Sequence, residues 1–151
     1  RLRVWLRLWL WIWLRREREM IIAVDFDGTI VEHKYPSIGR EKPFAIDTLR
    51  RLADEGHRLI LWTAREGSLL QDAVEFCRKR GLEFYAVNSN QPQGGLFEGK
   101  EPVGKIIADV YIDDRNLGGI PDWGTIYYQI AQKHLSHHHR KKWWQLFRSK
   151  R

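Results

Sequence analysis

Short apolar runs alternate with helical patterns through the middle of the chain. Residues 20–26 form a continuous apolar run, which is typical of a strand buried on both faces of a parallel sheet. Residues 58–63 form a second run of this kind, and shorter apolar segments at 83–87 and 109–112 predict two further strands. The pattern therefore indicates a sheet of about four strands.

The segments between and after these strands carry apolar residues at helical spacing. They predict helices at residues 43–55, 68–80 and 125–135. Pro43 suits the first turn of the first helix, and Gly56 suits the position just past its end. Strands that alternate with helices indicate an α/β fold.

An α/β chain of this kind is expected to form a parallel sheet with helices on both faces, joined by right-handed crossovers. The 151 residues suffice for one ordinary domain, and we assign residues 20–135 to it. Ligands of such sheets bind outside the carboxyl ends of the strands. The chemistry should therefore follow directly after residues 24, 62, 87 and 112.

Charge separates this domain from the two ends of the chain. The net charge of +7 divides into +4 for residues 1–19, +7 for residues 133–151 and −4 for the segment between them. Six of the eight Trp residues also lie in the two ends. The basic charge is therefore weak evidence that the domain acts on nucleic acid. The single cysteine, Cys77, excludes an intramolecular disulfide framework and favours a reducing, cytoplasmic location.

Residues 1–19 form a basic, Trp-rich extension for which three explanations compete. Its apolar run at residues 8–14 is far shorter than the roughly 20 residues of a spanning helix, and no small-residue cleavage site follows it. The extension is an interfacial membrane anchor, a segment that binds a partner or tetramerises, or sequence upstream of a natural start at Met20. We favour the last, because the only Met directly precedes the first strand.

Residues 136–151 form a basic tail with interleaved aromatic residues. Such a tail suits contact with the phosphates and bases of a nucleic acid, or with an anionic membrane surface. A solvated, partly disordered terminus is the more common fate of such a sequence, and we favour it. The three adjacent histidines at 137–139 are expected to be incidental, because neighbours on one element do not converge on one ion.

Acidic pairs follow the first and the fourth predicted strands. Asp25 and Asp27 come after the first, and Asp113 and Asp114 come after the fourth. Carboxylates that converge at one sheet edge repel each other unless a cation neutralises them. Mg²⁺ suits a site that combines a few carboxylates with a phosphate. The two pairs therefore predict a magnesium site.

The same strand ends hold the groups that phosphoryl transfer needs. Asp25 would attack phosphorus to form an aspartyl-phosphate, and Asp27 would protonate the leaving alkoxide and then activate water. Thr63, after the second strand, would donate its hydroxyl to the phosphoryl oxygens, and Lys105 would bring a positive charge to them. The sequence thus predicts a hydrolase of phosphate monoesters.

The order of these motifs resembles the haloacid dehalogenase superfamily in its phosphatase form. The matching features are DFDGT, a strand ending in Thr, a Lys and a strand ending in DD, across about residues 20–130. The stretches FDGTIVEHKYPSIG, LILWTAREG and YIDDRNLGGIPDWG are similar to a small bacterial and phage group within that superfamily. The resemblance implies a three-layer, Rossmann-like fold with the strand order 3-2-1-4.

The resemblance also assigns roles to the acidic residues. Asp25 becomes the nucleophile and a Mg²⁺ ligand. Asp27 becomes the acid and base, and its main-chain carbonyl becomes a further metal ligand. Asp113 becomes a ligand of the metal, and Asp114 acts on the metal directly or through water.

The remaining motif positions are less distinctive in the sequence. The resemblance makes Thr63 the residue that binds the phosphoryl group and Lys105 the motif lysine, although Lys100 lies on the same loop and is the alternative. His33 is expected to face solvent. Asp122 is expected to cap a turn or a helix.

Four further residues are candidate contacts to the substrate: Gly28, Thr29, Arg65 and Asn116. The first two lie in the turn after the first strand, where they are also ordinary turn residues. Arg65 binds a substrate anion or pairs with a neighbouring acid, Glu66 or Asp114. Asn116 bridges to metal-bound water or caps a turn.

The chain has no room for the cap domain that closes the site in many members of this superfamily. About 15 residues separate Asp27 from the first helix, and the 41 residues between Thr63 and Lys105 supply a helix, a strand and a loop. An open site implies a bulky substrate, such as a phosphorylated protein or a nucleic-acid end, or closure by a neighbouring subunit of a homo-oligomer. The loops at 31–42 and 88–104 must then supply specificity.

The leading hypothesis is a Mg²⁺-dependent phosphomonoester hydrolase that acts on a phosphorylated substrate. One alternative is a catalytically degenerate module that keeps the fold for binding or regulation. Another is a phosphatase of nucleic-acid ends that uses the basic tail. Retention of the complete catalytic set argues against the degenerate module.

Overall fold

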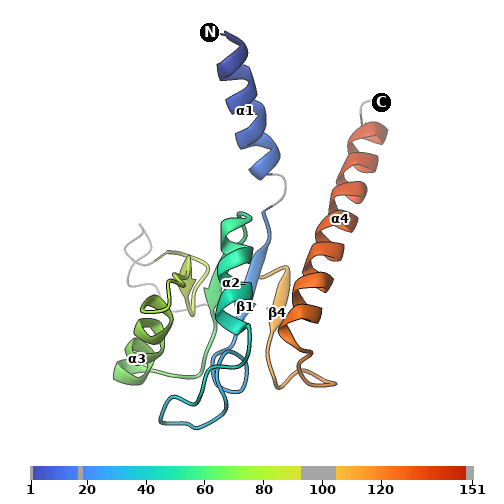
Figure 1. The fold of residues 1–151 in the computed structure, drawn as a ribbon. Coiled ribbons are helices and arrows are strands. Elements are labelled where there is room, and N and C mark those ends of the chain that lie inside the picture. The colour runs from blue at the N-terminus through green and yellow to red at the C-terminus, as the bar shows by residue number, and fades with distance from the viewer. Residues whose placement is uncertain (1, 17–18, 93–104, 149–151) are drawn as a thin grey trace.

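The computed structural model describes residues 2–16, 19–92 and 105–148 (Figure 1). Within the helices, the side chains of residues 11–16, 134 and 137–148 are not part of this description. Lys100, the alternative motif lysine, lies outside the described residues.

Four parallel strands form one sheet. They are β1 (Ile21–Val24), β2 (Arg58–Leu61), β3 (Ala86–Val87) and β4 (Val110–Ile112), in the order β3-β2-β1-β4. Val24 pairs with Leu61 on one side and with Ile112 on the other, so three strands end level at one edge. The predicted α/β class, parallel sheet and strand order are confirmed.

Four helices accompany the sheet: α1 (Leu2–Arg16), α2 (Ala45–Asp54), α3 (Gly67–Arg78) and α4 (Trp123–Arg148). The helices α2 and α3 lie where apolar spacing predicted them, with ends that differ by one to two residues. The predicted closing helix begins two residues earlier, where the carboxylate of Asp122 accepts the Thr125 N–H at 3.0 Å and hydroxyl at 2.6 Å. Asp122 therefore caps a helix, as predicted.

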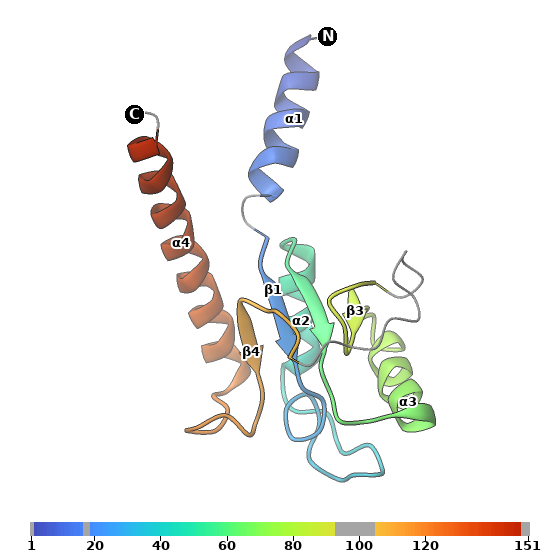
Figure 2. The ribbon, with the colours of Figure 1, turned by 180° about the vertical axis from the view of Figure 1, so that it is seen from behind.

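The helices α2, α3 and α4 all pack on one face of the sheet. Their buried residues share a core with Ile22, Val24, Leu59 and Leu61, which point to the same side of their strands. Seen from behind, the sheet lies in front of α2 (Figure 2). The crossovers from β1 to β2 and from β2 to β3 run in one direction, and right-handed crossovers in one direction place their helices on one face.

The opposite face of the sheet is covered without a helix in the described part of the chain. There Ala23, Ile60 and Ala86 pack against Ile106, with Tyr111 beside them. The connection from β3 to β4 reverses direction and crosses this face, and its described residues 105–109 are not helical. The prediction of helices on both faces is therefore wrong for the described residues.

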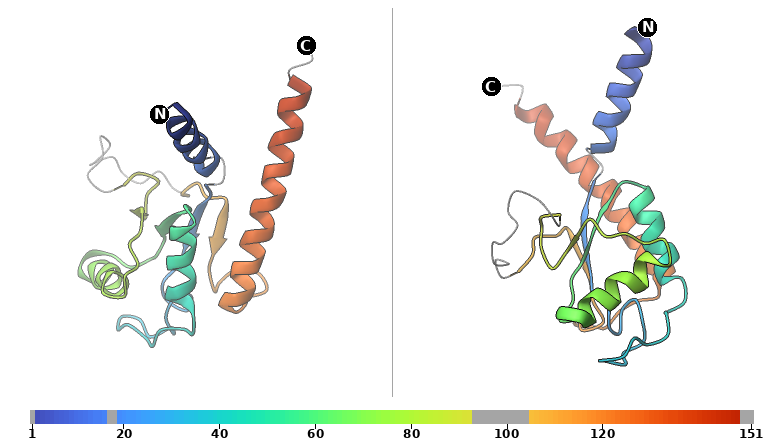
Figure 3. Two further views of the ribbon diagram at one scale, coloured as in Figure 1. Left: turned by 45° about the horizontal axis from the view of Figure 1, so that its top comes forward. Right: turned by 90° about the vertical axis from the view of Figure 1, so that its left-hand side faces the viewer.

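Both ends of the chain are helical. The side chains of residues 2–10 on α1 are all exposed, and the helix extends from the end of the sheet where β1 begins (Figure 1). The helix α4 does not end near residue 135 as predicted but continues to Arg148, and the two helices leave the sheet at the same end (Figure 3). No described helix is both long enough and apolar enough to cross a membrane.

Deletion of residues 1–18 should leave the stability of the domain almost unchanged. Among the side chains that the structure describes, contact with the sheet begins at Glu19, which pairs with Arg58, and at Met20, whose N–H donates to Nδ1 of His57 at 3.2 Å. Loss of exposed surface alone changes stability by about 0.5 kcal/mol or less, which is a shift of roughly 2 °C in the unfolding midpoint. Thermal denaturation followed by circular dichroism measures this shift.

The matched destabilised control for this deletion is Leu49→Ala, because Leu49 is fully buried in the core beneath α2. It should lose about 2–5 kcal/mol. A deletion that destabilises the domain as much as this control would show that α1 packs against the domain in solution.

Candidate active site

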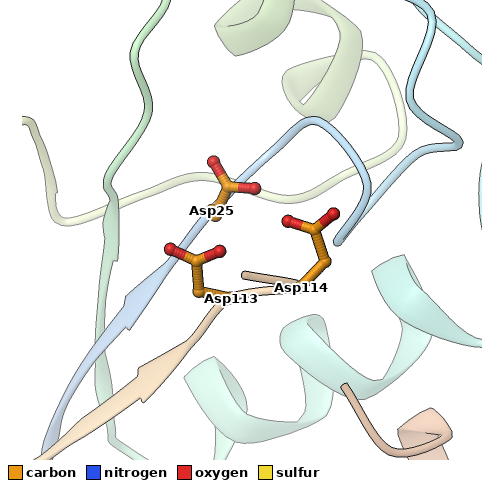
Figure 4. Close-up of side chains that lie close together, drawn as sticks. All are labelled: Asp25, Asp113 and Asp114. Carbon is orange, nitrogen blue, oxygen red and sulfur yellow. The ribbon is translucent and has the colours of Figure 1, made fainter. Parts of the chain in front are cut away.

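Three carboxylates converge at the carboxyl edge of the sheet (Figure 4). Asp25 follows β1, and Asp113 and Asp114 follow β4. One oxygen atom from each lies within 4.8 Å of the others. The strand register causes this, since the Asp25 N–H continues the ladder by donating to the carbonyl of Ile112 at 2.9 Å. The prediction that these three acids meet is confirmed.

The hydroxyl of Thr29 holds two of the three acids in place. It donates to Oδ2 of Asp25 at 3.0 Å and accepts the backbone N–H of Asp114 at 3.0 Å. Thr29 itself is fully buried. The structure therefore gives Thr29 a positioning role in place of the predicted contact with substrate.

Gly28 lets the turn after β1 approach the third acid. Its φ of 88° lies in the left-handed region, and a Cβ atom at this position would overlap the carboxylate of Asp114. The Gly28 carbonyl accepts a hydrogen bond from the ammonium group of Lys42. Close packing against Asp114 thus requires a glycine at position 28, a predicted loop residue.

The electrostatics of the cluster favour a bound cation. Burial is the main cause that raises the pKa of Asp25 from 3.8 to about 6, and the charges of Asp113 and Asp114 add to it. The backbone N–H of Phe26 and the Thr29 hydroxyl act in the opposite direction. Oδ1 of Asp114 is buried and has no hydrogen-bond partner. A carboxylate oxygen without a donor, beside two other acids, fits a metal ion, so this cluster is able to hold one.

Asp27, the fourth predicted acid, faces a different partner. Its two carboxylate oxygens accept hydrogen bonds from Nε and Nη2 of Arg65 at 2.6 and 2.7 Å. The Arg65 side chain is 1% exposed and also donates to the carbonyls of Pro36 and Ser37, each at 2.9 Å. The carboxylate of Asp27 is therefore held by a buried guanidinium, apart from the three-acid cluster.

This arrangement corrects the predictions for Arg65. Four of its five N–H bonds reach Asp27 and the two carbonyls, and its guanidinium lies 5.2 Å from the ring centroid of Phe26 and 5.4 Å from that of Tyr35. The hydrogen bond to Asp27 is the main cause that raises the pKa of Arg65. Arg65 is thus neither free for a substrate anion nor paired with Glu66 or Asp114.

Thr63 lies at the end of β2, where Asn88 fixes its backbone. The Thr63 N–H donates to Oδ1 of Asn88 at 2.8 Å, and Nδ2 of Asn88 donates to the Thr63 carbonyl at 2.9 Å. The Thr63 hydroxyl accepts the Arg65 N–H at 3.2 Å and lines the cavity, so its proton is able to donate to a bound group. Sequence reasoning missed Asn88, although it pointed to the position after residue 87.

Lys105, the predicted motif lysine, contacts an aromatic ring. Its ammonium nitrogen lies 4.8 Å from the ring centroid of Tyr111, and it is not among the residues that line the cavity. Lys42, which sequence reasoning also missed, is the cation that contacts the turn after β1. Its position in a long loop between two predicted elements gave no signal.

Asn116 occupies a turn after β4, as one of its two interpretations predicted. Its side-chain amide donates to the carbonyl of Tyr111 at 3.4 Å, and its backbone N–H donates to the carbonyl of Asp113 at 3.3 Å. The Asp113 carboxylate accepts the N–H of Arg115 at 2.8 Å in the same turn. The turn therefore orients Asp113 toward the cluster.

A cavity of about 560 Å³ opens beside the cluster. Asp25, Asp113 and Thr63 are among the residues that line it. Its lining also includes His33, which is exposed, as expected from the sequence. The remaining lining residues are Asp27, Tyr35, Trp62, Ala64, Arg65 and Arg115. The lining thus combines three acids with aromatic and basic side chains.

One solved structure resembles this chain over most of its length. It is described as a conserved protein coded by a locus from Bacteroides thetaiotaomicron, and it is 60% identical in sequence, with a TM-score of 0.69. The match covers 76% of this chain and 92% of that chain. No protein-family model and no curated protein matches the sequence.

Gly28→Ala should destabilise the domain more than the same change at Gly118. Both residues have a φ near 90°, but a Cβ at Gly118 would meet nothing within 4 Å, whereas at Gly28 it would overlap Asp114. The backbone penalty of about 1–2 kcal/mol is common to both, and the overlap adds about 1–3 kcal/mol at Gly28 alone. Urea denaturation measures both losses. Equal losses would contradict the close packing of Gly28 on Asp114.

Asp25→Asn should stabilise the metal-free protein at pH 7.5. The native protein holds the Asp25 proton up to pH of about 6, whereas the unfolded chain releases it near 3.8. Stability therefore falls as the pH rises through this window, and the neutral amide avoids that loss. Urea denaturation in EDTA should show the gain at pH 7.5 and a smaller one at pH 4.5.

Asp47→Asn is the matched control for this measurement, because Asp47 is exposed on α2, outside the acidic cluster. It should show no gain at pH 7.5. A variant at Asp25 that is less stable than the wild type at both pH values would contradict the electrostatic cost assigned to this carboxylate.

Proposed function

We propose a function for this chain from the chemistry of its own site. The chain belongs to the same protein family as the conserved protein from Bacteroides thetaiotaomicron. It is a Mg²⁺-dependent hydrolase of phosphate monoesters that works through an aspartyl-phosphate on Asp25. The observation that carries the proposal is the convergence of three acids beside a cavity that Thr63 also lines. Metal, nucleophile and phosphate donor would then meet at one place.

The two carboxylate oxygens of Asp25 would have different roles. Oδ2 accepts the Thr29 hydroxyl, which fixes the orientation of the carboxylate, and Oδ1 is the atom assigned to attack phosphorus. The bond from Oδ1 to phosphorus forms as the bond from phosphorus to the leaving oxygen breaks. The Thr63 hydroxyl donates to a phosphoryl oxygen, where negative charge must be stabilised.

Asp25, Asp113 and Asp114 are the residues that would hold Mg²⁺. When bound there, the ion would neutralise their mutual repulsion and withdraw charge from the phosphoryl oxygens. The unpartnered Oδ1 of Asp114 supports this assignment. Carboxylate oxygens suit hard divalent cations, and a few carboxylates together with a substrate phosphate are a common set for Mg²⁺.

Asp27 remains the residue assigned to proton transfer, and Arg65 limits how it acts. A carboxylate offers about four acceptor sites, and the guanidinium occupies two of those of Asp27. The others are able to carry the proton that passes to the leaving oxygen and then to take one from the water that hydrolyses the aspartyl-phosphate. Arg65 thus holds this base beside the cavity while it works.

A phosphatase screen of wild type and Asp25→Asn tests the proposal. The substrates are phosphosugars, nucleotides, phosphopeptides and 3′-phosphorylated oligonucleotides, each with Mg²⁺ or with EDTA. We expect Mg²⁺-dependent release of phosphate on at least one substrate, and a loss of roughly 10³-fold or more in Asp25→Asn, because removal of a nucleophile eliminates the covalent route. Mass spectrometry should detect the phosphorylated Asp25 peptide.

Asp47→Asn controls for loss of a carboxylate elsewhere and should keep wild-type activity, since Asp47 is exposed on α2. Hydrolysis that survives in Asp25→Asn would overturn the assigned nucleophile. Silence on every substrate, with Mg²⁺ still bound, would favour the catalytically degenerate module instead.

A further inference from the structure

The cavity beside the acidic cluster has two aromatic residues in its lining. Tyr35 comes from the loop between β1 and α2, and Trp62 follows β2. The Tyr35 residue is 54% exposed, although large aromatic side chains are usually buried. An exposed ring at a cavity wall offers its face to a bound molecule.

Hydrogen bonds from the buried Arg65 fix the backbone next to Tyr35. Arg65 donates to the carbonyls of the two residues that follow it, Pro36 and Ser37, and its guanidinium lies 5.4 Å from the centroid of the Tyr35 ring. The anchor itself is fixed, because Arg65 is 1% exposed and bound at two points to Asp27. The Tyr35 ring therefore loses little conformational entropy when it binds a ligand.

The other aromatic residue is also held in position. The ring centroid of Trp62 lies 5.3 Å from that of Tyr111, whose hydroxyl donates to the carbonyl of Ile106 at 2.5 Å. The exposed His33 and Arg115 add basic groups to the same lining. The cavity thus combines aromatic surfaces with basic groups, beside the residues assigned to phosphate.

We propose that this cavity selects phosphate monoesters whose leaving group carries a planar aromatic ring, and that the ring stacks on Tyr35. The inference rests on the proposed function for the position of the phosphate. An aliphatic leaving group would gain little from fixed rings, whereas a nucleobase or a phenol ring gains stacking on them. The loop of Tyr35 then performs the selection that a cap domain performs elsewhere.

Two pairs of small substrates test the selection, and the two members of each pair differ by one aromatic group. Adenosine 5′-monophosphate is compared with ribose 5-phosphate, and phosphotyrosine with phosphoserine, as kcat/KM with Mg²⁺. We expect the wild type to prefer the aromatic member of at least one pair by roughly 5- to 150-fold, the range for stacking of one base on one ring. The pair that discriminates identifies a nucleotide or a phenolic ester as the source of the ring.

Variants assign the preference to the ring of Tyr35. Tyr35→Leu should lose most of the preference by lowering kcat/KM for the aromatic substrate, with the aliphatic one changed less than about twofold. Tyr35→Phe should keep the preference, because it keeps the ring. Tyr128→Leu is the matched control, since Tyr128 is 63% exposed on α4 and does not line the cavity. Equal kcat/KM within both pairs, or a preference that persists in Tyr35→Leu, overturns the inference.

Binding separates this inference from the proposed function. Calorimetry with Mg²⁺ measures the Kd of the same four compounds for the wild type and for Tyr35→Leu. Ring-dependent binding that Tyr35→Leu abolishes, without hydrolysis of any compound, would overturn the hydrolase and support the aromatic site. Hydrolysis without any effect of the ring on kcat/KM or Kd would overturn the aromatic site alone. Absence of both binding and hydrolysis would overturn both.

Discussion

Repulsion among three carboxylates is the constraint around which this fold is organised. Parallel register at the end of the sheet brings Asp25 and Asp113 together, and the Thr29 hydroxyl ties Asp25 to the backbone of Asp114. Gly28 is needed because the turn passes too close to Asp114 for any side chain. Each of these features helps to hold like charges within 4.8 Å of one another, which lowers the stability of the fold. A structural role alone would not require that arrangement, whereas a bound cation would make it favourable.

A second buried charge, on Arg65, links the site to the loop that forms its wall. Burying an ion pair is costly unless its remaining hydrogen-bonding groups are satisfied, and here two carbonyls and two aromatic rings complete the shell of Arg65. The pair with Asp27 therefore fixes a catalytic candidate and the loop of Tyr35 through one side chain. The shape of the cavity wall and the position of the residue proposed for proton transfer are coupled in this way.

The sequence was informative wherever backbone register decides the structure. The meeting of Asp25 with Asp113 follows from apolar runs and strand ends, which are local patterns, whereas the strand order came from the resemblance that the motifs carry. The partner of Asp27 was not predictable, because Arg65 lies 38 residues away and several acids were equally available to it. The one-sided packing of the helices was missed because the general rule for α/β folds was applied to the whole sheet, although no helix was predicted between β3 and β4. Lys105 was assigned by its place in a motif order, and the structure sets it against Tyr111 instead.

The course of α4 bears on whether the basic tail assists the site. This helix begins beside the carboxyl edge of the sheet, at Trp123, and runs back along the strands to leave at the end where β1 begins (Figure 1, Figure 3). The acidic cluster follows β1 and β4, at the opposite end. Within one molecule, α4 therefore places residues 136–148 away from the cavity. Salt screens the electrostatic attraction of their charges over roughly 10 Å. Recognition of the substrate must then come from groups that line the cavity itself. The tethered Tyr35, with His33 and Arg115, provides them without help from the ends of the chain.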